Sequence, residues 1–154
     1  MLHSNQFERA AQSITHRDQR GSRGEAPVQV DTPILIIDDD RLTGKALAAM
    51  LNAAGYDDVR AVRSAERAMT VAEALRPAIV FLDIDLPAPG GYDLALRMQR
   101  NARLRAMRLI ALTGNVVHGT REEARAAGFE RFLVKPVMQV ELDKILRRPT
   151  NASK

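Results

Sequence analysis

Five polar side chains, widely separated along the chain, are of the types that bind and transfer a phosphoryl group. Asp38 and Asp39 are adjacent, and Asp83, Thr113 and Lys135 follow at long intervals. Carboxylates hold divalent cations or attack phosphorus, a hydroxyl donates a hydrogen bond to a phosphoryl oxygen, and an ammonium neutralises its charge. Such chemistry needs all five groups in one place, so the elements around them have to bring them together.

Each of these groups follows an apolar run. The runs are Ile34 to Ile37, Ile79 to Leu82, Leu109 to Leu112 and, slightly more mixed, Phe132 to Val134. Near-continuous apolar runs predict strands buried on both faces, as in a parallel sheet covered by helices. In such sheets the ligand crevice lies at the carboxyl ends of the strands. The acids, the hydroxyl and the amine are therefore predicted to converge on one crevice.

The segments between these runs have helical patterns, so strand and helix alternate. A shorter strand is predicted at 59–62, and helices are predicted at 42–54, 64–75, 92–100, 116–127 and 137–146. Five strands alternating with five helices imply right-handed crossovers and a flavodoxin-like, doubly wound α/β fold, (βα)5, with a five-stranded parallel sheet in the order 2-1-3-4-5. The switch point of that order lies between the strands that end in Asp38 and Asp83.

The acids at the switch point favour a magnesium site. Asp38 and Asp39 face Asp83 across one strand spacing, about 5 Å, and like charges this close are unfavourable without a cation between them. Carboxylates, a backbone carbonyl near Asp85 and waters offer only oxygen ligands, which suits Mg²⁺. Helix capping is the alternative interpretation. It accounts for Asp40, but not for three acids in a row together with an acid on another strand.

Asp83 is also a candidate nucleophile. A carboxylate next to Mg²⁺ can attack phosphorus to give an acyl phosphate. Lys135 would then supply positive charge to the phosphoryl oxygens, and the Thr113 hydroxyl would donate a hydrogen bond to another of them. Taken singly, a lysine at a strand end is usually a solvent-exposed residue without a further role, and a threonine is common in strands. Together, at the ends of ordered strands, they predict a phosphoryl-transfer site.

From about residue 32 to residue 147 the chain resembles a receiver domain of the two-component response regulators. The matching motifs are Ile-Ile-Asp38-Asp39, Phe-Leu-Asp83-Ile-Asp85-Leu-Pro87, Ala-Leu-Thr113-Gly114 and Leu-Val-Lys135-Pro136. The resemblance implies that Asp38 and Asp39 bind Mg²⁺. It also implies that Asp83 accepts a phosphoryl group from a histidine kinase or a histidine phosphotransfer protein. Thr113 and Lys135 would detect that group.

The resemblance further implies a conformational switch. The family's switch aromatic falls on Phe132, which would enter the space vacated by Thr113 and bias the face built from residues 115–147 toward binding a downstream protein. Asp85 and Asn115 occupy the positions at which the family tunes hydrolysis of the phosphoryl group. We therefore expect a signalling domain that phosphorylation controls, rather than an enzyme. We expect it to be a monomer or to form a dimer on phosphorylation.

Two local features next to the site are notable. The Lys135-Pro136 bond is expected to be cis, a state essentially confined to bonds before proline. The family's loop after the phosphoacceptor usually ends in Asp-Gly, whereas this chain has Pro89-Gly90-Gly91. The chain thus lacks one polar turn residue of the family pattern.

The composition is that of one soluble globular domain. The 154 residues suffice for a single core, and the absence of cysteine excludes disulfides, thiol catalysis and cysteine zinc sites. No window approaches ~18 consecutive apolar residues and the first thirty are polar, so we expect a cytoplasmic protein without a membrane span or signal peptide. The predicted parts are a flexible N-terminal extension at 1–32, the receiver domain at 33–148 and a C-terminal tail at 149–154.

Three other functions share part of this pattern. A phosphatase of the haloacid dehalogenase type would share Asp83-Ile84-Asp85, but it carries that motif on its first strand. A DNA-binding regulator is disfavoured because so few residues follow the last helix, and the net charge of +4 comes without interleaved aromatic residues. The third, a receiver module cut from a hybrid histidine kinase, stays open beside a stand-alone receiver.

Overall fold

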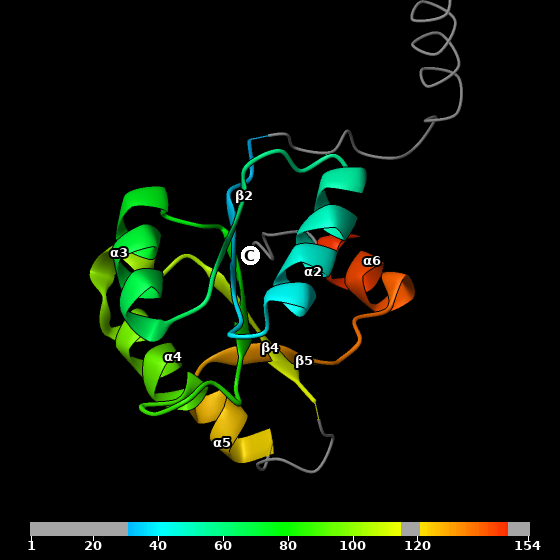
Figure 1. Ribbon diagram of the computed structural model, residues 1–154. Helices are drawn as coiled ribbons and strands as arrows, with labels where there is room; N and C mark the ends of the chain where they lie inside the picture. Colours follow the sequence, from blue (N-terminus) through cyan, green and yellow to red (C-terminus); the bar gives the residue numbers. More distant parts are fainter. Residues whose placement is uncertain (1–30, 115–120, 148–154) are drawn as a thin grey trace, which may run out of the picture.

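The computed structural model describes residues 31–114 and 121–147 and shows a sheet between two layers of helices (Figure 1). The strands are β1 (Ile34–Ile37), β2 (Val59–Val62), β3 (Ile79–Asp83), β4 (Arg108–Thr113) and β5 (Phe129–Val134). The helices are α2 (Arg41–Ala53), α3 (Ala65–Leu75), α4 (Gly91–Arg100), α5 (Arg121–Ala126) and α6 (Gln139–Arg147), with a short 3-10 helix at Ala102–Leu104. The predicted extension at 1–32 and tail at 149–154 lie almost wholly outside the described residues.

All five strands are parallel, and their order in the sheet is β2-β1-β3-β4-β5. This is the predicted doubly wound topology, and the prediction is confirmed. β1 lies between β2 and β3, so the chain leaves β1 in one direction and later continues from β3 in the other. The carboxyl ends of β1 and β3 therefore form the switch point, which is where ligands bind in sheets of this kind.

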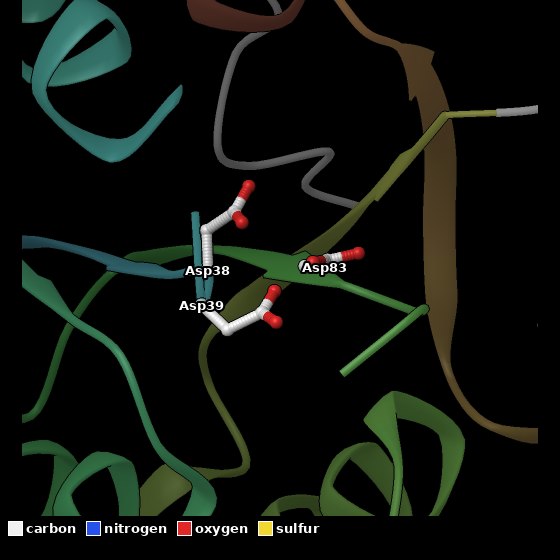
Figure 2. Close-up of side chains that lie close together, drawn as sticks. All are labelled: Asp38, Asp39 and Asp83. Carbon is white, nitrogen blue, oxygen red and sulfur yellow. The ribbon is translucent and has the colours of Figure 1, made fainter. Parts of the chain in front are cut away.

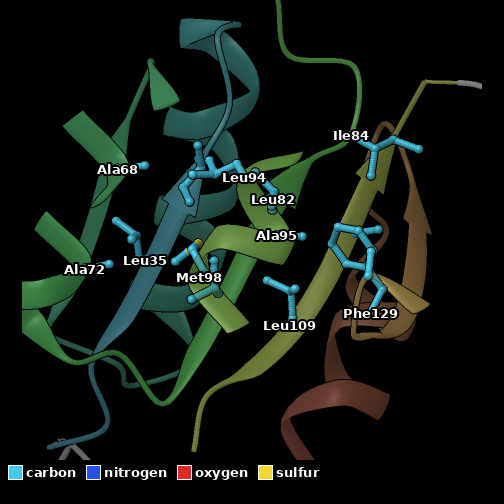
Figure 3. Packing of buried hydrophobic residues seen from close by; sticks show 14 of the residues in the cluster. Leu35, Ala68, Ala72, Leu82, Ile84, Leu94, Ala95, Met98, Leu109 and Phe129 are labelled. Carbon is cyan, nitrogen blue, oxygen red and sulfur yellow. The ribbon is translucent and has the colours of Figure 1, made fainter. Parts of the chain in front are cut away.

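Apolar residues on the two faces of the sheet make two separate cores. Along β1, Leu35 and Ile37 point into one core and Ile34 and Ile36 into the other, because successive side chains of a strand alternate between faces. The first core contains the buried faces of α3, α4 and α5, and part of it is shown in Figure 3. The second is covered by α2 and α6. Burial on both faces explains why this strand is apolar throughout.

Local sequence signals set both ends of α2 and the start of α3. Asp40 caps α2, its carboxylate accepting from the Leu42 amide at 3.0 Å and from the Thr43 hydroxyl at 2.8 Å. Gly55, with φ of +102°, follows the end of the same helix, a conformation that glycine adopts without steric cost. Ser64 caps α3 by accepting from the Arg67 amide at 3.3 Å. Asp40 thus has a structural role as a helix cap, and Asp38 and Asp39 remain as the acids that could bind a ligand.

β5 begins three residues earlier than the predicted strand. Phe129 pairs with Leu109 and Arg131 pairs with Ile110, with a register shift between them. The shift lets the Glu130 carboxylate meet the Arg108 guanidinium, with Nη2 to Oε2 at 2.6 Å and Nε to Oε1 at 3.0 Å. Arg108 also donates to the carbonyl of Ile145 in α6 at 2.9 Å. These contacts stabilise the packing of β5, the edge strand that Lys135 follows, against β4 and α6.

Candidate functional site

Three carboxylates gather at the carboxyl ends of β1 and β3 (Figure 2). Asp38 and Asp83 are buried, at 1% and 2% exposure, whereas Asp39 is exposed. Each contributes one oxygen to a set whose members all lie within 4.8 Å of one another. The structure thus brings together the three acids that the sequence predicted. Three negative charges at this spacing repel one another, and a bound cation would offset this repulsion.

Lys135 supplies one positive charge to this cluster. Its ammonium lies 2.8 Å from Oδ2 of Asp38 and 3.2 Å from Oδ2 of Asp83. The backbone amide of Lys135 donates to the carbonyl of Thr113 at 2.8 Å, so the end of β4 fixes the residue that ends β5. Burial lowers the pKa of Lys135, but its contacts with the two aspartates outweigh this effect and leave the pKa raised. The lysine is therefore a permanent cation between two carboxylates.

Backbone amides hold the two buried carboxylates in place. The Asp40 amide donates to Oδ1 of Asp38 at 2.9 Å, and the Asp85 amide donates to Oδ1 of Asp83 at 2.8 Å. Oδ2 of Asp38 is buried and accepts from the Lys135 ammonium at 2.8 Å. A buried carboxylate oxygen of this kind, next to two further carboxylates, is a suitable ligand for a hard divalent ion. The donor set fits Mg²⁺.

The electrostatics of Asp83 differ from those of an ordinary aspartate. Burial is the main cause that raises the pKa of its carboxyl to about 6, and the charge of Asp38 raises it further. The hydrogen bond from the Asp85 amide and the contact with Lys135 act in the opposite direction. Without a divalent ion, ionised Asp83 is thus unfavourable in the folded protein, and a cation that binds there would relieve this cost.

This raised pKa predicts a pH-dependent stability for the metal-free protein. The pKa of Asp83 is about 6 in the folded protein, and its ordinary value is 3.8. The protonated carboxyl therefore stabilises the folded state fully below about pH 4, and this stabilisation is lost as the pH rises through 6. In EDTA at pH 7.5 we expect Asp83→Asn to melt about 2–5 °C above wild type, and the difference should disappear near pH 4. Circular dichroism melts across this range measure it. A difference that stays constant with pH would contradict the assignment.

Thr113 and Phe132 occupy different environments. Thr113 ends β4, is buried, and accepts at its backbone carbonyl from the Lys135 amide. Phe132 points outward from β5, is 37% exposed, and packs against the ring of Phe129 with centroids 6.2 Å apart. The Asp85 carboxylate is exposed and lies 3.5 Å from the Gly114 amide. Asn115 lies outside the described residues.

The cis prediction for the Lys135-Pro136 bond is confirmed, and Ala88-Pro89 is cis as well. The structure also explains the missing polar residue before Gly91. Gly90 adopts φ of +91° and ψ of +163° at the start of α4, a combination that is essentially open to glycine alone. An aspartate would be strained in this conformation. The helix accordingly begins without a side-chain cap.

Gly91 is a residue of the site whose role was not apparent from the sequence. A Cβ built on it would collide with the backbone carbonyl of Asp83 and lie 2.5 Å from the Cα of Ile84. The first turn of α4 thus packs directly against the backbone of the candidate nucleophile. The sequence shows a glycine here, but it does not show which backbone that glycine faces.

Replacing Gly91 by alanine is therefore expected to displace either α4 or the Asp83 backbone. Overpacking of this kind costs about 1–3 kcal/mol of unfolding free energy, and we expect urea denaturation to show it. Gly44→Ala is the matched control, because that helical glycine has only one ordinary contact, 3.8 Å from the Ala61 Cβ, and alanine favours helix. Equal stability of Gly91→Ala and wild type would contradict the tight packing.

Comparison with known proteins identifies the family. The model of the response regulator receiver domain matches residues 34–147, and the chain belongs to that family. It is a receiver domain of two-component signalling. It is 29% identical over 104 residues to the polar-differentiation response regulator DivK of Brucella anthropi, covering 68% of this chain and 84% of the relative. The alternative of a dehalogenase-type phosphatase is thereby set aside.

Solved structures agree with this assignment. The receiver domain of the sensor histidine kinase PA1611 of Pseudomonas aeruginosa, which holds a magnesium ion in its active site cleft, is 32% identical with a TM-score of 0.69, over 77% of this chain and 97% of that one. The chemotaxis response regulator CheY4 of Vibrio cholerae shares the fold, with 23% identity and a TM-score of 0.69 over 76% and 97% of the two chains. Within residues 31–114 and 121–147, no helix is long and apolar enough to cross a membrane.

Proposed function

We propose that this receiver domain is a Mg²⁺-dependent phosphoacceptor and that Asp83 is the residue phosphorylated. One observation carries the proposal: the Asp38, Asp39 and Asp83 oxygens lie within 4.8 Å of one another while Lys135 bridges two of these acids. A purely structural acid cluster would not need a nucleophilic carboxylate beside both a cation site and a fixed ammonium.

The residues that would hold Mg²⁺ are the three clustered carboxylates and the backbone carbonyl of Asp85. Bound there, the ion would neutralise charge on the carboxylates and on the incoming phosphoryl oxygens. The close grouping of the buried Asp38 and Asp83 with Asp39 supports this role. So does the magnesium ion in the cleft of the related PA1611 receiver domain.

Phosphoryl transfer then requires two bond changes. An oxygen of the Asp83 carboxylate attacks phosphorus and forms a P–O bond, while the bond from phosphorus to the donor breaks. With a phosphohistidine donor the electron pair returns to the imidazole nitrogen, which takes up a proton; with acetyl phosphate, acetate leaves. Lys135 lies 3.2 Å from Oδ2 of Asp83, where it can neutralise charge on the transferred group. The donor in the cell is a histidine kinase or a histidine phosphotransfer protein.

Residues of the neighbouring strands would respond to the acyl phosphate. Its charge attracts the Thr113 hydroxyl, the ring of Phe132 moves inward, and the face formed by residues 115–147 changes its affinity for a downstream protein. The apolar residues Val134, Met138 and Val140 are exposed on this part of the chain, which supports partner binding there. Asp85 and Asn115 tune the rate at which the phosphoryl group is hydrolysed.

The domain is thus a signalling module that assists its own phosphorylation and dephosphorylation. The likeness to the receiver domain of a sensor histidine kinase supports the second candidate, a receiver module from a hybrid kinase. The likeness to DivK supports a response regulator. In either case we propose the same chemistry at Asp83, with the active form either monomeric or dimeric.

Intact mass spectrometry after incubation with acetyl phosphate tests the proposal. In the presence of Mg²⁺ we expect one phosphoryl group per chain, and with EDTA in place of Mg²⁺ we expect none. Incorporation that is equal in EDTA would contradict the metal site. Absence of any adduct, together with absence of beryllofluoride binding, would contradict the phosphoacceptor function.

A further inference from the structure

Tyr92, in the first turn of α4, carries a buried hydroxyl for which no hydrogen-bond partner lies among the described residues. Buried phenol hydroxyls usually find a partner, because an unpaired polar group pays its desolvation cost without compensation. An unpaired hydroxyl in an otherwise well-packed protein therefore needs an explanation, and a hydrogen bond made in another state of the protein is one.

The position of Tyr92 connects the phosphoacceptor to the exposed aromatic. It directly follows Gly91, whose Cα abuts the backbone of Asp83. Its ring packs edge-to-face on Phe129, with centroids 5.7 Å apart and an interplanar angle of 89°. Phe129 in turn contacts Phe132. The three rings form a continuous path from the start of α4 to the outward face of β5.

The charges of two carboxylates act on the hydroxyl. Burial raises the pKa of Tyr92, and the charges of Glu123 and Asp85 raise it further. Glu123 belongs to α5, whose Ala124 lies in the same apolar core as the Tyr92 ring. Figure 1 shows α5 near the start of α4. Of the two charges, that of Glu123 acts on the hydroxyl more strongly, so Glu123 is the acceptor if α5 shifts toward α4.

We propose that Tyr92 is a positioning residue of the switch, whose hydroxyl donates a hydrogen bond to the Glu123 carboxylate when Asp83 is phosphorylated and so draws α5 toward α4. The inference rests on the proposed function and specifies how that site controls α5. In the unphosphorylated state the hydroxyl has no partner among the described residues; in the phosphorylated state it donates to Glu123. The pair thus favours the phosphorylated arrangement, and by linkage it strengthens binding of any phosphoryl mimic at Asp83.

Beryllofluoride, which mimics the phosphoryl group on an aspartate, provides the test. Its affinity in the presence of Mg²⁺ is measured by calorimetry for wild type, Tyr92→Phe, Glu123→Gln and the double variant. Each single variant should bind about 2- to 10-fold more weakly, and the double variant should be no weaker than either, since both remove the same interaction. Glu122→Gln is the matched control on the same helix and should bind as wild type does.

A direct probe of the hydroxyl is available because the chain has two tyrosines and no tryptophan. In a Tyr56→Phe background Tyr92 is the one remaining fluorophore. A phenol hydrogen-bonded to a carboxylate fluoresces more weakly, so beryllofluoride should quench the emission, and Glu123→Gln should abolish the quenching. Melting of the unphosphorylated Tyr92→Phe protein should not fall below wild type, because no hydrogen bond is lost in that state.

Several results would overturn the inference. Unchanged affinities and unquenched emission, with wild type still binding beryllofluoride, would refute the Tyr92–Glu123 pair and leave the proposed function standing. Additive effects in the double variant would show that the two residues act separately. A lower melting temperature of Tyr92→Phe without a change in affinity would show a merely structural role. Failure of wild type to bind beryllofluoride would contradict the proposed function and the inference together.

Discussion

Asp83→Asn is expected to abolish incorporation of a phosphoryl group from acetyl phosphate. The amide oxygen of asparagine is a poor nucleophile and forms no stable acyl phosphate, whereas the rest of the site is preserved because asparagine has nearly the same shape. The carboxylate of Asp83 is held by the Asp85 amide on one oxygen and lies near Lys135 on the other, so both oxygens have defined surroundings. We therefore expect the adduct to vanish rather than to weaken.

The control for this prediction is Asp85→Asn. Asp85 is two residues away and exposed, and the same chemical change there should leave one phosphoryl group per chain while changing its lifetime. Intact mass spectrometry measures both variants side by side. An Asp83→Asn protein that still carried the wild-type adduct would refute the assignment of the phosphoacceptor.

Lys135→Met is expected to slow phosphorylation by acetyl phosphate by about 10²- to 10³-fold, the cost of removing one preorganised charge from a phosphoryl-transfer site. Methionine keeps much of the length of lysine but leaves Asp38 and Asp83 without the cation that lies 2.8 and 3.2 Å from them. Because Lys135 lowers the pKa of Asp83, its loss raises that pKa further. Mg²⁺ binding should persist, since a competing cation has been removed.

The rate of adduct formation at saturating Mg²⁺ measures this effect. Lys144→Met is the matched control: Lys144 lies on α6, is exposed, and pairs with Glu141 at 3.5 Å. Exposed pairs of this kind contribute little, so its rate should equal that of wild type. Equal rates for the Lys135 and Lys144 variants would show that the bridging lysine has no part in the transfer.

The strands that carry the site could be predicted from sequence because burial on both faces makes them apolar throughout. Ile34 to Ile37 is the clearest case, since each of its residues is fully buried in one of the two cores. The convergence of Asp38, Asp83 and Lys135 then follows from the topology alone, because parallel strands end at the same edge of the sheet. The functional side chains needed no contact information to be found.

The start of β5 could not be predicted in the same way. This strand lies at the edge of the sheet, and Glu130 and Arg131 are exposed, so half of it lacks the apolar pattern. Its pairing depends on a register shift opposite Leu109 and Ile110. The packing of Gly91 on Asp83 and the unpaired hydroxyl of Tyr92 are likewise tertiary features, and local sequence carries no signal for which groups meet across the fold.

Direct location of the phosphoryl group tests the central proposal. The protein is phosphorylated with acetyl phosphate and Mg²⁺, treated with borohydride, which reduces an acyl phosphate to the alcohol, and digested for peptide mass spectrometry. We predict that the reduced side chain is Asp83 and no other residue. A reduced side chain at Asp38, Asp39 or Asp85, or a phosphoryl group retained on a histidine, serine or threonine, would contradict the proposed site.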